Sequence, residues 1–113
     1  MLERSDLDML IKKYESAVES YKLHGVTESR YYEYPAEVGG FMRYLQEEPW
    51  VKYDYSPDVM DGIFESISSA SIDDVRVVLT GVSRAERFSD GYWKSVFETG
   101  RLSPVIERLK EIF

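Results

Sequence analysis

Four charged residues in one short stretch have the types and spacing to bind an anion: Arg84, Glu86, Arg87 and Asp90. Arginine side chains bind phosphate or carboxylate through paired hydrogen bonds, and a helix starting at Ser89 would add backbone N–H donors. The other interpretation is structural: Arg87 and Asp90, three residues apart, form an ion pair that fixes the angle between two helices. We favour the structural interpretation and keep the phosphate or carboxylate pocket as the competing hypothesis.

Aromatic residues form a second group of candidates, because the chain has nine tyrosines and two tryptophans in 113 residues. Rings in loops can grip a peptide, a base or a partner chain. Base stacking normally accompanies positive charge and this region is acidic, so a protein partner fits better than nucleic acid. Core packing beneath the loops is the competing interpretation. The aromatic interaction candidates are Tyr32, Tyr34, Trp50, Tyr53, Tyr55 and Trp93.

Metal and covalent chemistry have little support in the composition. The chain has no cysteine and a single histidine, His24, which excludes disulfides and thiolate metal sites and disfavours a histidine-based triad. Asp54, Asp58 and Asp61 offer oxygen ligands, but their spacing matches no calcium loop, and we interpret them as solvated surface acids. We therefore expect no metal, no cofactor and no catalytic residue.

The net charge of −7 disfavours non-specific binding to nucleic acid, which needs clustered lysine and arginine. The charge is uneven. Residues 28–74 contain eleven acids and three bases, a net charge of −8, whereas residues 76–113 contain seven bases and five acids, a net charge of +2. No apolar run approaches the roughly 20 residues of a membrane span, and the first residues do not resemble a signal peptide. We expect a cytoplasmic protein without a membrane partner.

Two predicted helices position the charged stretch. The first runs from about residue 72 into 84–87, with Ser71 as its N-cap and apolar residues at i, i+3, i+4 and i+7. The second is predicted to start at Ser89 as N-cap and to stop at Gly100, which suits the residue after a helix. Trp93, Val96 and Phe97 face inward from this second helix.

Four more helices are predicted from apolar periodicity and capping residues. They begin at Ser5 with Asp8 as its capping-box partner, at Pro35, at Ser56-Pro57 and at Ser103-Pro104; the first ends near His24-Gly25 and the second at Pro49. Gly39-Gly40 within the second helix predicts a kink or the close approach of another element. The apolar stripe of the terminal helix leaves self-association open, with the basic end of one copy against the acidic middle of another.

Two aromatic segments could form a small sheet. Residues 50–55 alternate large apolar and polar side chains, a strand pattern, and residues 31–34 could pair with them. Two short runs make only a marginal sheet, so we prefer extended loops over the core and leave a minor aromatic hairpin between residues 31 and 55 open.

Three sequence segments resemble a small prokaryotic family, domain of unknown function 6508. One is the run Tyr32–Val38 followed by Phe41, and the second is Tyr53-Asp54-Tyr55, where members often have an aromatic-Asp-Trp sequence. The third, the most specific, comprises Leu79-Thr80, Arg84, Glu86-Arg87-Phe88, Asp90-Gly91 and Glu98-x-Gly100. The resemblance covers roughly residues 30–110, leaves the first helix outside, and implies a mostly helical domain but no activity.

Together these patterns predict an all-α protein, residues 1–113 forming a single compact domain of five or six helices. The favoured function is a non-enzymatic protein-interaction or regulatory module that binds an unidentified protein partner or itself. The alternative is an enzyme that binds a small molecule or phosphate at the corner formed by Arg84, Glu86, Arg87 and Asp90.

Overall fold

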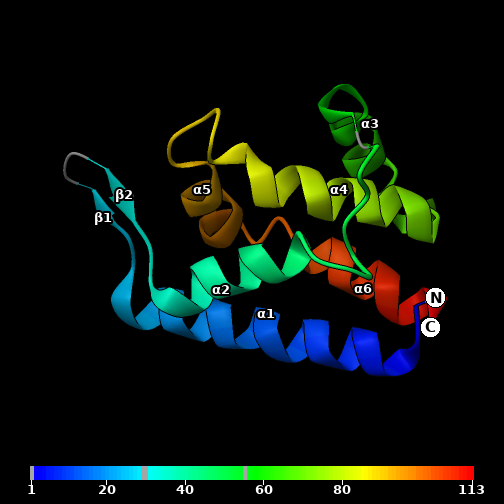
Figure 1. Cartoon of the computed structure of the whole chain (residues 1–113), viewed down its shortest axis with the longest axis horizontal. Helices are drawn as coiled ribbons and strands as arrows, with labels where there is room; N and C mark the ends of the chain where they lie inside the picture. Colours follow the sequence, from blue (N-terminus) through cyan, green and yellow to red (C-terminus); the bar gives the residue numbers. More distant parts are fainter. Residues whose placement is uncertain (1, 29–30, 55) are drawn as a thin grey trace.

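The computed structural model describes residues 2–28, 31–54 and 56–113 of the chain (Figure 1). Within these residues the chain is mainly helical, as the sequence predicts, and its sheet consists of one short antiparallel hairpin. The six α-helices of the described residues are α1 (Arg4–His24), α2 (Ala36–Leu45), α3 (Met60–Glu65), α4 (Ile72–Ala85), α5 (Tyr92–Thr99) and α6 (Ser103–Ile112). The hairpin strands are β1 (Thr27–Glu28) and β2 (Tyr32–Glu33).

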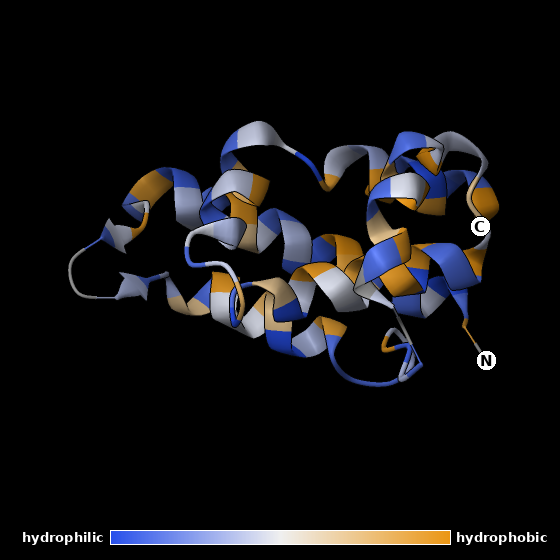
Figure 2. Ribbon diagram, turned by 90° about the horizontal axis from the view of Figure 1, so that it is seen from above, coloured by the Kyte–Doolittle hydropathy of each residue, from blue (hydrophilic) through white to orange (hydrophobic). Residues whose placement is uncertain are grey.

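The helices are arranged so that α2 and α6 lie between α1 and α4 (Figure 1). Helix α1 runs along one side of the molecule, α4 lies on the opposite side, and α3 covers the outer side of α4. The hairpin projects at one end and the two chain termini lie together at the other, as both views show (Figures 1 and 2). Helix α4 therefore contacts most of the other helices and is the central element of the fold.

The hydrophobic core explains why α4 occupies this position. Its residues at i, i+3, i+4 and i+7, Val75, Val78, Leu79 and Val82, are completely buried. Hydrophobic and hydrophilic residues alternate along each helix, as expected for amphipathic segments (Figure 2). Other buried core residues come from α1, α2, α5, α6 and the segment after α2; they include Leu7, Leu10, Val38, Phe41, Trp50, Val96 and Leu109.

Capping at the helix ends agrees with the sequence in part. Ser71 caps α4 by accepting a hydrogen bond from the Asp74 N–H (3.1 Å), as predicted. The predicted cap of α1 is wrong: the helix starts one residue before Ser5, and the Glu3 N–H donates to the Asp6 carboxylate (2.8 Å). A carboxylate at the third helical position can thus cap a helix whose N-cap is not a serine.

The predicted close approach at Gly39-Gly40 is not observed. A Cβ atom at Gly39 would meet only the Arg43 guanidinium, at an ordinary 3.5 Å, and one at Gly40 would meet the same group at 3.9 Å. Among the described residues, no other element therefore packs closely against these two glycines.

The segment predicted as one helix after Ser56 is divided. Helix α3 is flanked by short 3₁₀ turns at Pro57–Val59 and Ile67–Ser69, and its apolar residues are only half-buried. The Ser66 hydroxyl donates to the Gly62 carbonyl (3.2 Å), and the Ser69 hydroxyl donates to the Ser66 carbonyl (3.1 Å). Such local side-chain bonds compete with the regular helix ladder and explain why the helix is short.

The hairpin differs from the pairing that the sequence left open. Tyr32 and Glu33 pair with Glu28 and Thr27, respectively, and not with the segment after Trp50. That segment is held by α4 instead. The Lys52 N–H donates to the Thr80 hydroxyl (2.9 Å), and the Arg76 guanidinium donates to the carbonyls of Trp50 and Val51. The strand-like alternation of residues 50–54 thus belongs to a loop with turns at both ends, held against a helix.

The terminal helix α6 buries the stripe that suggested self-association. Val105 and Leu109 are completely buried and Ile106 nearly so, against α1, α4 and the turn before α4. Most of this stripe is thus covered within a single chain, and Ile112 at its end remains 37% exposed. Among the described residues, no helix has both the length and the apolar character required to cross a membrane.

Candidate functional site

The charged stretch forms the turn between α4 and α5. The sequence predicts Ser89 as the N-cap of α5, and this is wrong: the N-cap is Gly91, with a left-handed φ of 86°. A side chain at that position would be strained and would also approach the Tyr32 ring at 3.2 Å. The backbone of the turn is ordered by hydrogen bonds from the N–H groups of Phe88 and Ser89 to the Ala85 carbonyl (both 3.0 Å).

The Glu86 carboxylate caps the N-terminus of α5. It accepts hydrogen bonds from the N–H groups of Gly91 (2.8 Å) and Trp93 (2.9 Å), and from the Tyr34 hydroxyl (3.1 Å). A carboxylate is favoured at this position because the first N–H groups of a helix lack partners and the helix dipole is positive there. Glu86 thus belongs to this chain's own helix cap.

The other N–H groups at this helix end are also engaged. The Tyr92 N–H donates to the Ser89 carbonyl (3.1 Å), and the Lys94 N–H donates to the Tyr34 hydroxyl oxygen (3.1 Å). Four successive donors, from Gly91 to Lys94, therefore have partners within the chain. The N-terminus of α5 has no donor left for a phosphate or carboxylate ligand.

The hairpin and the segment after it support the corner from the side. The Lys94 ammonium binds the Glu28 carboxylate of β1 (3.2 Å), and this hydrogen bond raises the pKa of Lys94. The Tyr34 ring packs on the Trp93 indole (5.3 Å between centroids), whose N–H donates to the Val82 carbonyl (3.0 Å). Burial raises the pKa of Tyr34, so its hydroxyl stays protonated and can donate to Glu86.

The two arginines of the stretch have different surroundings. Arg84 is half-buried on α4, whereas Arg87 and Asp90 are exposed in the turn. Within the described part of the chain, the predicted ion pair between Arg87 and Asp90 is not formed. The corner is held by the half-buried Glu86 and Tyr34 interactions rather than by this pair.

An apolar groove, which we call the corner groove, lies between α3, the second half of α4 and the start of α5. It has a volume of about 450 Å³. Gly81 makes room on the α4 side, since a Cβ atom there would come within 2.6 Å of the Met60 sulfur. The groove is lined by Met60, Gly81, Arg84, Ala85, Phe88, Ser89 and Tyr92.

Two aromatic residues of the corner groove are unusual. Phe88 lies at its edge and is 83% exposed, the most exposed large hydrophobic residue in the described part of the chain. The Tyr92 hydroxyl oxygen is buried and has no hydrogen-bond partner among the described residues. Burial raises the pKa of Tyr92, which keeps this hydroxyl neutral. The groove is thus bordered by an exposed ring, while the Tyr92 hydroxyl is enclosed within the protein.

The sequence model of the Family of unknown function (DUF6508) matches residues 7–113. The chain belongs to this family. The match includes nearly all of α1, which the sequence resemblance had left outside. No curated protein and no solved structure matches the DUF6508 chain significantly.

The aromatic candidates of this DUF6508 protein are distributed over different environments. Trp50 is completely buried, with its indole N–H donating to the Tyr44 hydroxyl (3.0 Å), and so cannot reach a partner. Tyr32 is half-buried against Gly91, and Tyr34 and Trp93 belong to the corner. Tyr53 is exposed, and Tyr55 lies outside the described residues.

The acidic candidates are separated from one another. Asp54 forms an ion pair with Lys52 (2.9 Å), Asp61 forms one with Arg101 (3.4 Å), and Asp58 is exposed in the turn before α3. No group of three or more histidine or acidic residues able to hold a metal ion occurs in residues 2–28, 31–54 and 56–113.

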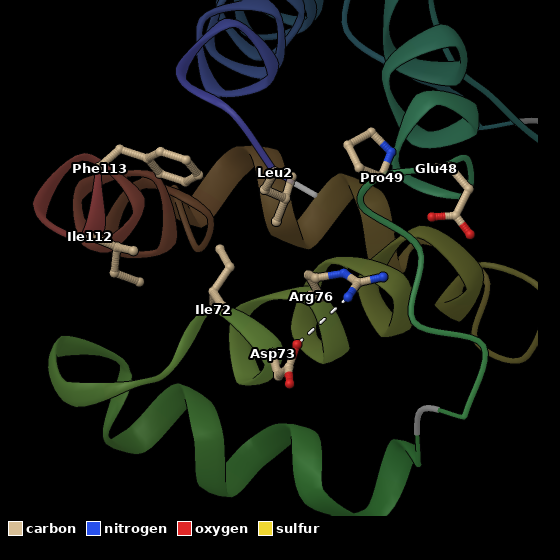
Figure 3. A pocket seen from close by; sticks show the side chains of 8 residues that line it. All are labelled: Leu2, Glu48, Pro49, Ile72, Asp73, Arg76, Ile112 and Phe113. Atoms are coloured by element: carbon tan, nitrogen blue, oxygen red, sulfur yellow. Dashed lines mark ion pairs between the residues drawn. The ribbon is translucent and has the colours of Figure 1, made fainter.

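A second hollow of about 390 Å³ lies beside the two termini (Figure 3). Its cation, Arg76, is already engaged with the carbonyls of Trp50 and Val51 and with the Asp73 carboxylate (3.6 Å). Local spacing gave no signal for Arg76, because the carbonyls that it binds lie about 25 residues away along the chain. The hollow is lined by Leu2, Glu48, Pro49, Ile72, Asp73, Arg76, Ile112 and Phe113 (Figure 3).

Proposed function

We propose that this DUF6508 protein is a non-enzymatic, cytoplasmic protein-interaction module, and that it recognises its partner through the corner groove. The observation that carries the proposal is Phe88, 83% exposed at the edge of this groove. A large exposed ring beside a concave apolar surface is typical of protein-interaction sites, where aromatic residues are enriched. The backbone of the turn is already ordered in the free chain, so binding a partner costs little conformational entropy there. This supports the interaction function.

The composition of the corner groove argues against catalysis there. Ser89 is a lining hydroxyl, but among the described residues neither a histidine nor a carboxylate lines the groove to act as its base. The predicted alternative, a phosphate-binding enzyme, needs helix N–H donors that already bind Glu86 and Tyr34. Both points favour a binding surface over an active site.

A second candidate function, binding of a small apolar molecule, is favoured by one observation. The groove is lined mainly by apolar side chains, among them the Tyr92 ring, which suits the apolar part of a small ligand. The groove volume of about 450 Å³ also lies within the range of small-molecule sites. The surface of the groove is mostly apolar, which fits a mostly apolar ligand.

Site-specific photo-cross-linking in the native cells tests the interaction function. A benzophenone amino acid replaces Phe88 in one variant and Tyr53, which is 71% exposed, in the other. We expect a discrete cross-linked protein from position 88 at several times the yield from position 53. Equal yields at the two positions would contradict the proposal.

A matched pair of substitutions links the cross-link to the groove. Ala85→Leu fills part of the groove and should reduce the cross-link several-fold, whereas Ala36→Leu, in an exposed first turn of α2, should not. Both changes exchange one good helix former for another, so the fold should be retained. If native mass spectrometry instead finds a small organic molecule bound, and Ala85→Leu releases it whereas Ala36→Leu does not, the second candidate function is favoured.

A further inference from the structure

We propose that the partner of the corner groove is the same groove of a second copy, with Phe88 of each chain inserted into the other's groove. This inference rests on the proposed function, because it assigns the partner of the same surface. In a two-fold dimer the same patch faces itself, so the patch must contain both a projecting group and a cavity that accepts it. The corner groove satisfies this condition because the projecting side chain, Phe88, lies at the edge of the cavity on the same chain.

The sizes of the two parts are compatible. Phe88 is 83% exposed and therefore projects into solvent rather than filling the groove of its own chain. A cavity of roughly 150 Å³ is enough to hold a benzene ring. The corner groove, at about 450 Å³, can hold a phenyl ring while Met60, a flexible thioether, adjusts around it.

The charges beside Phe88 are arranged to pair across a two-fold axis. The sequence of the turn is Arg87-Phe88-Ser89-Asp90, with a cation before the ring and an anion two residues after it. If two turns run antiparallel about an axis between Phe88 and Ser89, Arg87 lies opposite the partner's Asp90, and this contact occurs twice. Both side chains are exposed, and they do not pair with each other within the described part of the chain.

The backbone holds this turn ready for such a contact. The N–H groups of Phe88 and Ser89 both bind the Ala85 carbonyl, and the Arg87 N–H binds the Arg84 carbonyl (3.2 Å). Glu86, the residue before the Arg87 to Asp90 turn, is fixed by three hydrogen bonds. Little conformational freedom is therefore lost on pairing, which favours association through even a small patch. The corner groove is lined by far fewer residues than the roughly 20–30 per partner of a standard stable interface, so the dimer should be weak and transient.

Sedimentation equilibrium from micromolar to millimolar concentration tests the pairing. The weight-average mass of the wild-type protein should rise above 13.2 kDa with concentration, and Phe88→Ala should abolish the rise. Arg87→Asp or Asp90→Arg alone places like charges opposite each other twice and should weaken association at least tenfold. The double variant R87D/D90R restores opposite charges and should recover most of the wild-type association.

Three further results distinguish a loss of pairing from a loss of folding and from binding to a different partner. All four variants change only exposed side chains, so their circular dichroism melts should match the wild type and Ala36→Leu should associate normally. A protein that stays at 13.2 kDa throughout, or a double variant no better than either single one, would overturn the pairing. If the wild type stays monomeric while position 88 still cross-links to another protein in cells, the pairing of two copies is refuted and the interaction function stands. If the wild type stays monomeric and position 88 forms no cross-link, the interaction function is refuted as well.

Discussion

Replacing Glu86 with glutamine tests the physical account of the corner most directly. The carboxylate atom Oε1 accepts from Trp93 N–H and the Tyr34 hydroxyl, and Oε2 accepts from Gly91 N–H. A glutamine side chain can keep the first two with its amide oxygen, but its amino group then faces the Gly91 N–H. One partly buried donor is left without an acceptor, which costs about 1–3 kcal/mol. The loss of the anion from the helix N-terminus adds about 0.5 kcal/mol.

We therefore expect Glu86→Gln to lower the free energy of unfolding by about 2.5 kcal/mol, the sum of the middle of the first range and the dipole contribution. For a domain of this size that corresponds to a fall of about 10 °C in Tm. Urea unfolding followed by circular dichroism measures the change, and an unaltered m-value indicates that the unfolded state is unaffected. Glu107→Gln is the control, because it removes the same charge from a carboxylate that is 68% exposed and pairs with Lys110 at the surface. If the free energy of unfolding falls by less than about 0.5 kcal/mol in both variants, Glu86 does not stabilise the corner as a helix cap and this account is refuted.

Two more predictions concern the core and the pH dependence. Trp50→Ala should lower the free energy of unfolding by about 3–5 kcal/mol in the same urea assay, because it empties a fully buried site; a loss below about 1 kcal/mol would contradict the burial. Burial raises the pKa of Tyr34 above its ordinary value of 10.0, so the stabilisation is complete below about pH 10 and is lost as the pH rises through the folded-state pKa. Thermal melts from pH 8 to 12 should therefore show a smaller alkaline loss for Tyr34→Phe than for the wild type, and equal losses would contradict the assignment.

Helix α4 could be predicted from the sequence because all of its signals are local. Its serine cap, its apolar period and its position between two loops are contained in residues 71–85, and the structure confirms them. The start of α5 could not be predicted in this way. Its cap is a carboxylate five residues before Gly91, and this carboxylate is oriented by a tyrosine 52 residues earlier in the chain.

The aromatic candidates show the same limit. The spacing of residues 50–54 is compatible with a strand, a loop or a surface rim, and only tertiary contacts decide among them. Arg76 and Thr80 of α4 supply the hydrogen-bond partners that a neighbouring strand would otherwise provide. Composition drew attention to the corner, but it did not distinguish the buried Trp50 from the exposed Phe88.

The long-range cap of α5 has a consequence for the order in which the chain folds. A helix of eight residues is too short to be stable in isolation. Its N-terminal donors are satisfied partly by Tyr34, whose hydroxyl lies 60 residues from Lys94 along the chain, so a large loop must close before α5 gains this support. We expect α1 and α4, with local caps and continuous apolar faces, to form before α5. The corner groove, which needs the first residue of α5, would then be among the last surfaces to be completed.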